Sequence, residues 1–301
     1  MFIVLHRKFF YALSGLLMVA SVVAMVVWGF NPGLDFKGGS LLEISYTTAR
    51  PEVAVLNQVL APLSLDQSIR PTGETGYIIR LKSITETERA AMIKALSFQG
   101  TSTAPEVKRF DSIGPLLGKE ALSKSLVSIV FVLIAIVLFI TFAFRKVSEP
   151  VASWKYGFIT VFALLHDVLV PTGVFVALGH FAGFEVDTLF VTALLVILGF
   201  SVHDTIVVFD RVRENLKLSH VNRNKKSFAE IVGESINQTF VRSINTSLTT
   251  VLALFVLYFI GPEVTKHFSL ALLVGIVAGT YSSIFLGSPL LVTVEKWQNK
   301  K

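Results

Sequence analysis

The 301-residue sequence contains no cysteine, and only 16% of its residues are charged. Without cysteine, the chain forms no disulfide and has no thiolate nucleophile or Cys-based zinc or iron–sulfur site. The low charge argues against a soluble protein, in which roughly 25% of residues are charged. Hydrophobic residues instead make up 52% of the chain and occur in long blocks. Blocks of this kind are typical of membrane-spanning helices.

Common enzyme motifs are also missing. The string that comes nearest to a phosphate-binding loop, residues 114–120, has the wrong spacing and ends in glutamate, so the chain is not expected to bind ATP by itself. No HExxH zinc motif occurs. Gly199-Phe200-Ser201 matches the start of the GxSG motif of rhomboid-type proteases, but Val202 replaces the final glycine. Intramembrane proteolysis stays an alternative, and we predict no catalytic residue, cofactor or metal.

Six apolar blocks are each long enough to cross a bilayer, which takes roughly 20 residues. They span residues 9–28, 122–144, 157–178, 188–209, 241–260 and 268–292. The first block could instead be a signal peptide cleaved after Ala24. It is longer than a usual signal-peptide core of about 7–15 residues, which favours a membrane span.

Basic residues in the short loops predict the orientation of these spans. Fourteen lie on one side: Arg7, Lys8, Arg145, Lys146, Lys155, Arg211, Arg213, Lys217, Arg223, Lys225, Lys226, Lys296, Lys300 and Lys301. The short loops of the other side contain only Lys266. The first side, with both termini, is therefore predicted to be cytoplasmic in a bacterial inner membrane. The net charge is +6. The basic residues are distributed according to the side of the membrane and do not form a folded patch, so no nucleic-acid partner is expected.

The segment between the first two spans has a soluble composition and is predicted to lie outside the cytoplasm. Its pattern predicts strands at 40–47, 65–70, 76–82 and 106–111 and helices at 51–60 and 85–98. Thr85 and Glu88 form a capping-box signature. The order βαββαβ is that of a ferredoxin-like α+β fold. We therefore divide the chain into 1–30, 31–121 and 122–301, the last carrying five of the six transmembrane helices.

Three ionisable residues lie inside the predicted spans, where a charge costs at least about 2.5–3.5 kcal/mol. They are Asp167, Asp204 and Arg242. At a rise of 1.5 Å per residue, Asp204 and Arg242 lie roughly 24 and 27 Å from the outer ends of their helices. Asp167 lies about 15 Å into its helix, near the midplane. Similar depth makes Asp204 and Arg242 a candidate pair.

Polar residues follow each member of this pair at helical spacing. Ser201 and Thr205 share a face with Asp204, and Gln238, Asn245 and Thr249 share a face with Arg242. We predict that the two faces meet and that Asp204, Arg242 and Asp167 form a proton or ion relay. The alternatives are a static salt bridge and an arginine that snorkels to the interface. His166 and His203 each precede an aspartate and are interpreted as packing or supporting groups, because adjacent helical residues do not face one another.

Small residues repeat every fourth position in the last span, at Gly275, Gly279, Ser283 and Gly287. Such stripes allow helix backbones to approach closely. We interpret this stripe as a packing seam without chemistry.

Four strings carry a resemblance to a known family. They are GLDFKGGSLLEI after the first span, LLHDVL in the third, GFSVHDTIVVFDRVREN in the fourth and GTYSSIFLGSPLL in the sixth. Together they resemble the SecD/SecF family of bacterial protein-export subunits, and within it the SecF branch. The resemblance implies an RND-superfamily fold, in which six helices pair with six of SecD. It also implies that the pair uses the proton motive force to help move preproteins through SecYEG, with YajC as a further partner.

The resemblance also assigns particular residues. Asp204 matches the essential aspartate of the family, and Arg242 matches the arginine of the following span. Gly33, Asp35, Gly38 and Gly39 match a glycine-rich turn after the first span. Glycine allows positive φ and Asp35 could cap backbone N–H groups, so we expect the turn to join the first helix rigidly to the outer domain. An ordinary tight connection is the alternative.

Other functions remain open at this point. A stand-alone RND-type transporter would use twelve spans and larger outer domains. A purely structural assembly subunit would tolerate neutralisation of Asp204. The sequence does not distinguish protons from sodium ions as the coupling ion.

Overall fold

A computed structural model describes residues 1–47, 50–63, 65, 67–97, 105–144, 151–221 and 226–298. The chain divides into two compact units, and each is described by itself. The first comprises Met1–Asn31 and Val127–Lys301, and the second comprises Pro32–Leu126. Six basic residues used for the orientation, Arg145, Lys146, Arg223, Lys225, Lys300 and Lys301, lie outside the described residues.

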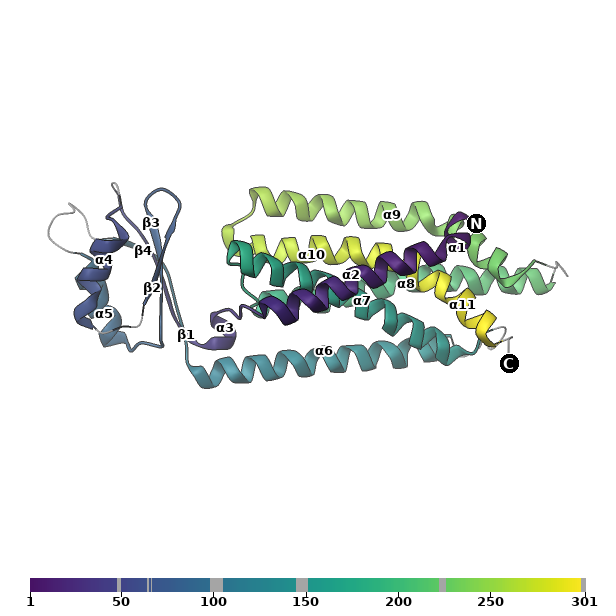
Figure 1. Ribbon diagram of the computed structural model, residues 1–301, viewed down its shortest axis with the longest axis horizontal. Coiled ribbons are helices and arrows are strands. Elements are labelled where there is room, and N and C mark those ends of the chain that lie inside the picture. Colours follow the sequence, from purple (N-terminus) through teal and green to yellow (C-terminus); the bar gives the residue numbers. More distant parts are fainter. Residues whose placement is uncertain are drawn as a thin grey trace. The chain divides into compact units, whose positions relative to one another are not determined.

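Six helical segments of the described chain are long and apolar enough to cross a membrane, which confirms the predicted polytopic helical fold. They are α2 (Arg7–Trp28), α6 (Pro115–Ala143), α7 (Ser153–Ala182), α8 (Thr188–Val221), α9 (Phe228–Ile260), and the last span formed by α10 (Glu263–Ser282), η2 (Ser283–Gly287) and α11 (Ser288–Gln298). A short helix, α1 (Phe2–Leu5), precedes them. Figure 1 shows α8, α9 and α10 running alongside one another.

Helices α8 and α9 continue beyond the apolar blocks into polar sequence. The start of α9 explains part of this extension, because Ser227 and Glu230 form a capping box. The Ser227 N–H donates to Glu230 Oε2 over 2.7 Å, and the Glu230 N–H donates back to Ser227 Oγ. Side-chain bonds also join the two extensions, since Asn215 donates to Ser235 Oγ over 2.8 Å. Hydropathy detects the apolar part of a helix alone, so the predicted bounds are shorter than the helices.

The last span contains a π-helical turn, η2, which hydropathy did not predict. Proline at position 289 lacks the N–H that would bond the Phe285 carbonyl, and its ring would clash with that carbonyl. A wider π turn relieves such a conflict. The Ser288 hydroxyl donates to the Ser283 carbonyl over 2.7 Å and supports the turn. The π turn begins at Ser283, directly after Ser282 of α10.

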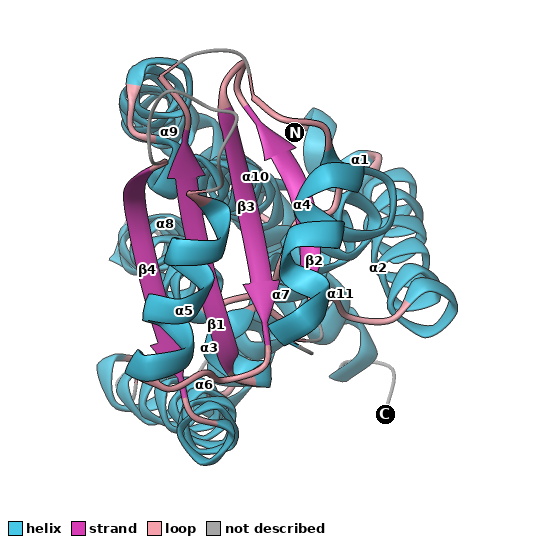
Figure 2. Cartoon of the chain, turned by 90° about the vertical axis from the view of Figure 1, so that its left-hand side faces the viewer, coloured by secondary structure: helices cyan, strands magenta, loops and turns pink. Residues whose placement is uncertain are grey.

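Unit 2 contains a four-stranded antiparallel sheet in the order β2-β3-β1-β4. The elements are β1 (Gly39–Ser45), α4 (Val53–Leu60), η1 (Ala61–Leu63), β2 (Ser68–Thr72), β3 (Gly76–Leu81), α5 (Glu86–Leu96) and β4 (Glu106–Ile113). This βαββαβ sequence confirms the predicted ferredoxin-like domain. Figure 2 shows α4 and α5 on the same face of the sheet.

Alternation along the strands builds the core of this domain. Leu42 and Ile44 of β1 and Ile79 of β3 are fully buried, and they pack with Leu56 of α4 and Met92 of α5. The predicted capping box is present, since Thr85 Oγ1 accepts from the Glu88 N–H and the Glu88 carboxylate accepts from the Thr85 N–H.

One strand is displaced from its prediction. Strand β2 was predicted at 65–70 but covers Ser68–Thr72, and it includes Pro71. Proline has no N–H for a sheet ladder and is tolerated at a sheet edge. Strand β2 is such an edge strand, because among the described strands it pairs only with β3. The predicted second helix ended at Phe98, which lies outside the described residues; the helix ends at Leu96.

A tight turn precedes β1 within unit 2. Residues Leu34–Lys37 form the one-turn helix α3, followed by Gly38 at φ 71° and Gly39 at φ 125°. A Cβ atom on Gly39 would lie 2.6 Å from the Leu81 carbonyl oxygen. A Cβ on Gly38 would lie 2.8 Å from Pro115 Cα, at the start of α6. Both the positive φ angles and the close backbone approach therefore require glycine at these two positions.

Candidate functional site

Asp204 lies inside the helical bundle on α8 with a side chain that is almost completely buried. Its Oδ2 atom accepts hydrogen bonds from Ser247 of α9 and Thr280 of α10, both at 3.4 Å. The two hydroxyl oxygens lie 2.5 Å apart. Each hydroxyl also bonds a carbonyl of its own helix over 2.9 Å. A hydroxyl has one proton to donate, so Asp204 competes for it and is held loosely.

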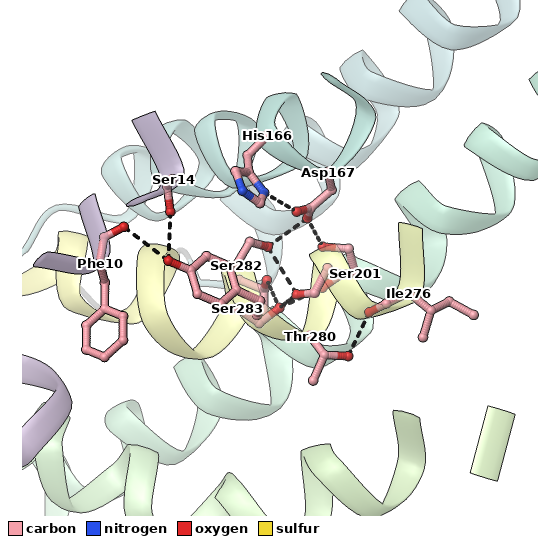
Figure 3. Close-up of polar contacts among 12 residues, drawn as sticks. Phe10, Ser14, His166, Asp167, Ser201, Ile276, Thr280, Ser282 and Ser283 are labelled. Carbon is pink, nitrogen blue, oxygen red and sulfur yellow. Dashed lines mark hydrogen bonds and ion pairs between the residues drawn. The ribbon is translucent and has the colours of Figure 1, made fainter. Parts of the chain in front are cut away.

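Asp167 of α7 is held more tightly, as Figure 3 shows. Its Oδ2 atom accepts from Ser201 of α8 over 2.5 Å and from Ser282 of α10 over 2.8 Å. Its Oδ1 atom contacts His166 Nδ1 at 2.9 Å. Both Asp167 and His166 are fully buried. Asp167 therefore joins three helices through short bonds, whereas Asp204 has two long ones.

Helix α10 supplies polar contacts to both carboxylates. The first two residues of the predicted stripe lie on α10, where Gly275 meets Ile197 and Gly279 meets Ser201, both on α8; Ser283 and Gly287 lie in η2. Ser283, however, contacts Thr205 of α8 at 3.1 Å between hydroxyl oxygens. Thr280 and Ser282, two positions apart and so on nearly opposite sides of α10, bond Asp204 and Asp167 respectively. The seam interpretation covered the four residues of the stripe, and Thr280 and Ser282 of the same span add polar contacts that it did not include.

The prediction that the polar faces of α8 and α9 meet is wrong. Gln238, Arg242, Asn245 and Thr249 are all exposed. The face of α9 turned inward carries smaller hydroxyl residues, which repeat every fourth position: Ser235, Thr239, Ser243 and Ser247. Adjacent positions on a helix differ by about 100°, so a shift of one residue from Arg242 to Ser243 changes the face. Small side chains let α9 approach its neighbours, while the larger polar ones remain outside.

Arg242 consequently does not pair with Asp204 in the described part of the chain. No ion pair joins them there, and Asp204 accepts from neutral hydroxyls instead. Gln238 bonds Arg211 of α8 over 2.6 Å, in the polar extension of the two helices. Ser201 and Thr205 are buried, like Asp204, and their hydroxyls bond Asp167 and Ser283.

The two histidines beside the aspartates have different surroundings. His203 is exposed. His166 is fully buried and contacts Asp167, its neighbour in sequence, so the expectation that the two do not face one another was wrong. The cause is the flexible reach of two side chains on the same turn. His166 Nε2 is buried and has no hydrogen-bond partner among the described residues.

The sequence contained signals for the contacts that we missed. The four-residue period of Ser235, Thr239, Ser243 and Ser247 is a small-residue stripe like that of the last span. A second signal is Pro171 within α7. It removes the N–H that would bond the Asp167 carbonyl, four residues earlier, and so loosens the helix at Asp167.

The turn motif of unit 2 places its four predicted residues close together in sequence and structure. Gly33 precedes α3, and its carbonyl accepts from the N–H groups of Phe36 and Lys37. Asp35 lies in the first turn of α3. Gly38 and Gly39 have the positive φ angles described above. Among the described residues, no cluster of three histidine, aspartate or glutamate side chains is arranged to hold a metal ion.

Comparison with known proteins assigns the family. The family described as "Protein export membrane protein SecD/SecF, C-terminal" matches residues 93–297, and the "SecD/SecF GG Motif" matches residues 23–49. The protein translocase subunit SecF of Thermobaculum terrenum is 42% identical over 99% of this chain and 94% of the relative. The chain belongs to the SecF family of protein translocase subunits. SecF of Synechocystis sp. is 35% identical over 96% of this chain and 92% of its own length.

Solved structures agree with this membership. SecDF of Thermus thermophilus, described as a translocon-associated membrane protein, matches 98% of this chain at 30% identity with a TM-score of 0.80. The chain spans 38% of the length of that SecDF chain. SecDF in a super-membrane-facing form matches the same share at 30% identity with a TM-score of 0.67. The protein is thus a multi-pass membrane protein of the translocase family.

Proposed function

We propose that the protein works with SecD and uses the proton motive force to promote preprotein translocation through SecYEG, with YajC as an associated subunit. The observation that carries this proposal is Asp204, a buried carboxyl group contacted by two hydroxyls at 3.4 Å. This surrounding supports the proposal that the Asp204 carboxyl gains and loses a proton without moving.

Neutral, exchangeable donors suit a carboxyl group that changes protonation. A charged carboxylate accepts hydrogen bonds from Ser247 and Thr280, while a protonated one can donate its own proton to either hydroxyl oxygen. The two donors that contact Asp204 Oδ2 are neutral hydroxyls, so neither fixes the carboxyl in its charged form. Asp167, with three short bonds, suits a positioning role in the relay.

In this proposal, Arg242 acts at the contact between this chain and a partner. Exposed polar side chains in a membrane span normally face protein or water, not lipid. Arg242 lies on the exposed face of α9, between apolar residues such as Val241 and Ile244. A partner helix bundle that covers this face would shield the guanidinium, and SecD is the partner that the solved SecDF suggests. Arginine stays protonated, so it would regulate the charge of Asp204 and not carry the proton.

The test is export into inverted membrane vesicles that contain SecYEG, SecD and this chain, with ATP held constant. We expect Asp204→Asn to insert and bind SecD but to lose the increase in export that a proton gradient produces. Asp210→Asn is the matched control, since Asp210 lies on the same helix but is exposed. A full gradient-dependent increase with Asp204→Asn would favour a structural assembly subunit instead.

The same vesicles distinguish the remaining alternatives. An ionophore that collapses only the sodium gradient should leave export unchanged, and one that collapses the proton gradient should abolish the increase. The reverse result would identify sodium as the coupling ion. Transport of a small molecule without SecD would indicate a stand-alone RND-type transporter.

We propose that the protein lies in the inner membrane with both termini in the cytoplasm and residues 31–121 on the opposite side of the membrane. The asymmetry of basic residues in the short loops supports it. A reporter enzyme active only outside the cytoplasm should work when fused at Thr101 and be silent after Lys225. Both positions lie outside the described residues. The opposite pattern would reverse the topology.

A further inference from the structure

A pocket of about 340 Å³ lies within unit 2, beside the turn that precedes β1. Among the described residues that line this basic pocket, three are cations and none is an acid: Lys37, Arg80 and Lys82. Ser68 and Gln67 add a hydroxyl and an amide, and the apolar part of the wall includes Pro32, Leu34 and Leu81. Cations combined with neutral hydrogen-bond donors are the groups that bind a phosphate.

The strand register places two of these donors side by side. Ser68 of β2 is paired with Arg80 of β3, so both side chains point to the same face of the sheet. Ile79, next to Arg80, is buried beneath α4 and α5, which cover one face of the sheet (Figure 2). Arg80 therefore points to the opposite face. Lys82 directly follows β3 and Lys37 ends α3, and both lysines are exposed.

The surroundings of Arg80 are positively charged. Arg70 lies two residues beyond Ser68 on the same strand and so on the same face of the sheet. Burial, and then the positive charge of Arg70, hold the pKa of the Arg80 guanidinium below its usual value. Arginine nevertheless stays protonated, so the like charges repel one another. A bound anion would offset this repulsion.

The basic pocket lies close to the start of a membrane span. Gly38 lines the pocket, and a Cβ atom on Gly118 of α6 would lie 3.0 Å from the Gly38 nitrogen. The apolar block of α6 begins at residue 122, four residues or roughly 6 Å further along the helix. The head-group layers of a bilayer are roughly 5–8 Å thick on each side of the hydrocarbon. Gly38 therefore lies at about the depth expected of lipid phosphates.

The first turn of α6 indicates which source of phosphate is available. Pro115 approaches Gly38 closely, and the next two residues, Leu116 and Leu117, are 78% and 61% exposed. Adjacent exposed leucines are typical of a surface that contacts a membrane. A phospholipid can place its acyl chains on these leucines while its phosphate reaches the cations, whereas free phosphate gains nothing from them.

We propose that the basic pocket binds the phosphate of an anionic phospholipid, whose acyl chains lie along the first turns of α6. Lys37, Arg80 and Lys82 would surround the phosphate, and Ser68 would donate to it. A zwitterionic head group also carries a positive charge, which the three cations would repel. The bound lipid would hold unit 2 at the membrane surface. This role is separate from proton coupling, because none of the pocket residues contacts Asp204.

The first test is lipid binding to the full chain in detergent, measured by native mass spectrometry with phosphatidylglycerol and phosphatidylcholine as probes. We expect phosphatidylglycerol to bind about tenfold more tightly, which corresponds to about 1.4 kcal/mol. Lys82→Gln should reduce this preference to less than about threefold, whereas Lys82→Arg should retain it. Lys94→Gln is the matched control, because it removes the same charge from an exposed position of α5, away from the pocket.

A phosphatidylglycerol with a photoreactive group near its phosphate locates the site in a bilayer. We expect cross-links within residues 34–38 and 80–82, and we expect Lys37→Gln and Lys82→Gln to lower them severalfold. Both lysines are exposed, so these variants keep the core of unit 2, and an unchanged thermal transition verifies this.

Three results would overturn the proposal. The first is equal binding of the two lipids by the unaltered protein. The second is cross-linking of Lys82→Gln at the level of the Lys94→Gln control. The third is displacement of phosphatidylglycerol by millimolar inorganic phosphate, which would show that the pocket binds a free anion and not a lipid.

Discussion

The Ser201 hydroxyl donates to Asp167 of α7 and not to Asp204, which lies one turn further along its own helix. This bond joins α8 to α7 inside the bundle. Ser282 adds α10 to the same carboxylate. The two buried aspartates consequently belong to separate polar clusters, and a substitution can address one without removing a direct contact of the other.

Ser201→Ala should reduce stability more than it reduces gradient dependence. The change removes one donor from a buried carboxylate and should lower the free energy of unfolding by about 1 kcal/mol, between the average of about 0.6 and the maximum of about 1.7 kcal/mol for hydrogen bonds in a membrane protein. Unfolding of the purified chain in mixed micelles measures this. Ser123→Ala, at an exposed position of α6, should change stability by less than about 0.5 kcal/mol. Equal effects from both changes would contradict the bond.

Arg242→Ala should reduce gradient-dependent export more than stability, which is the opposite of the result expected for Ser201→Ala. Its side chain is exposed in the single chain, so unfolding of the isolated protein should change by less than about 0.5 kcal/mol. Export that depends on the gradient should nevertheless fall strongly, because the guanidinium would no longer act on Asp204 in the complex with SecD. Asp167→Asn should impair export less than Asp204→Asn. A large loss of stability in Arg242→Ala would show that the residue supports the chain itself.

Residues 39–113 should fold when expressed alone. They contain the complete four-stranded sheet and both helices, with their own buried cluster around Leu42, Ile79 and Met92. A domain of this size is near the lower limit for an independent core. Circular dichroism should show strands and helices together with a cooperative thermal transition. A mainly helical spectrum, or no transition, would contradict the prediction.

The stability of that fragment should depend on pH through Glu88. Hydrogen bonds from the Thr85 N–H and then its hydroxyl hold the pKa of the Glu88 carboxyl below its usual value. A group whose pKa is lower in the folded chain stabilises it above the unfolded value, about 4.3. That contribution is lost as the pH falls through the folded pKa.

Glu88→Gln is the matched variant, because glutamine keeps the capping geometry without titrating. Thermal unfolding from pH 7 to pH 2 should show the parent more stable at neutral pH, with the difference shrinking as the acid form appears. A constant difference across this range would show that Glu88 makes no titrating contribution.

The spans and the sheet domain of unit 2 could be predicted because single, local rules determine them. A bilayer requires about twenty apolar residues, and β-strands alternate between buried and exposed positions. The capping box at Thr85 and Glu88 is a similarly local signal. Each of these features is decided within one short window of sequence.

The partners of Asp204 could not be predicted in the same way. They depend on which face of α9 turns inward, and Arg242 and Ser243 differ by one position on the helix. The size of the side chains decides which face of α9 turns inward, because Ser243 and Ser247 fit a close helix contact and Arg242 does not. The π turn likewise depends on Pro289, whose effect reaches four residues back to the Phe285 carbonyl.

The domain of unit 2 is attached at one end of a single strand pair. Gly39, where the chain enters β1 from the first span, is paired with Ile113, where it leaves β4 toward α6. Tension that separates these two tethers would open the β1–β4 ladder one rung at a time. A load applied to the whole domain along the strands would instead act on all rungs of this ladder at once. The attachment of this domain is therefore expected to yield when the two tethers spread apart and to resist when the domain is pulled along its strands.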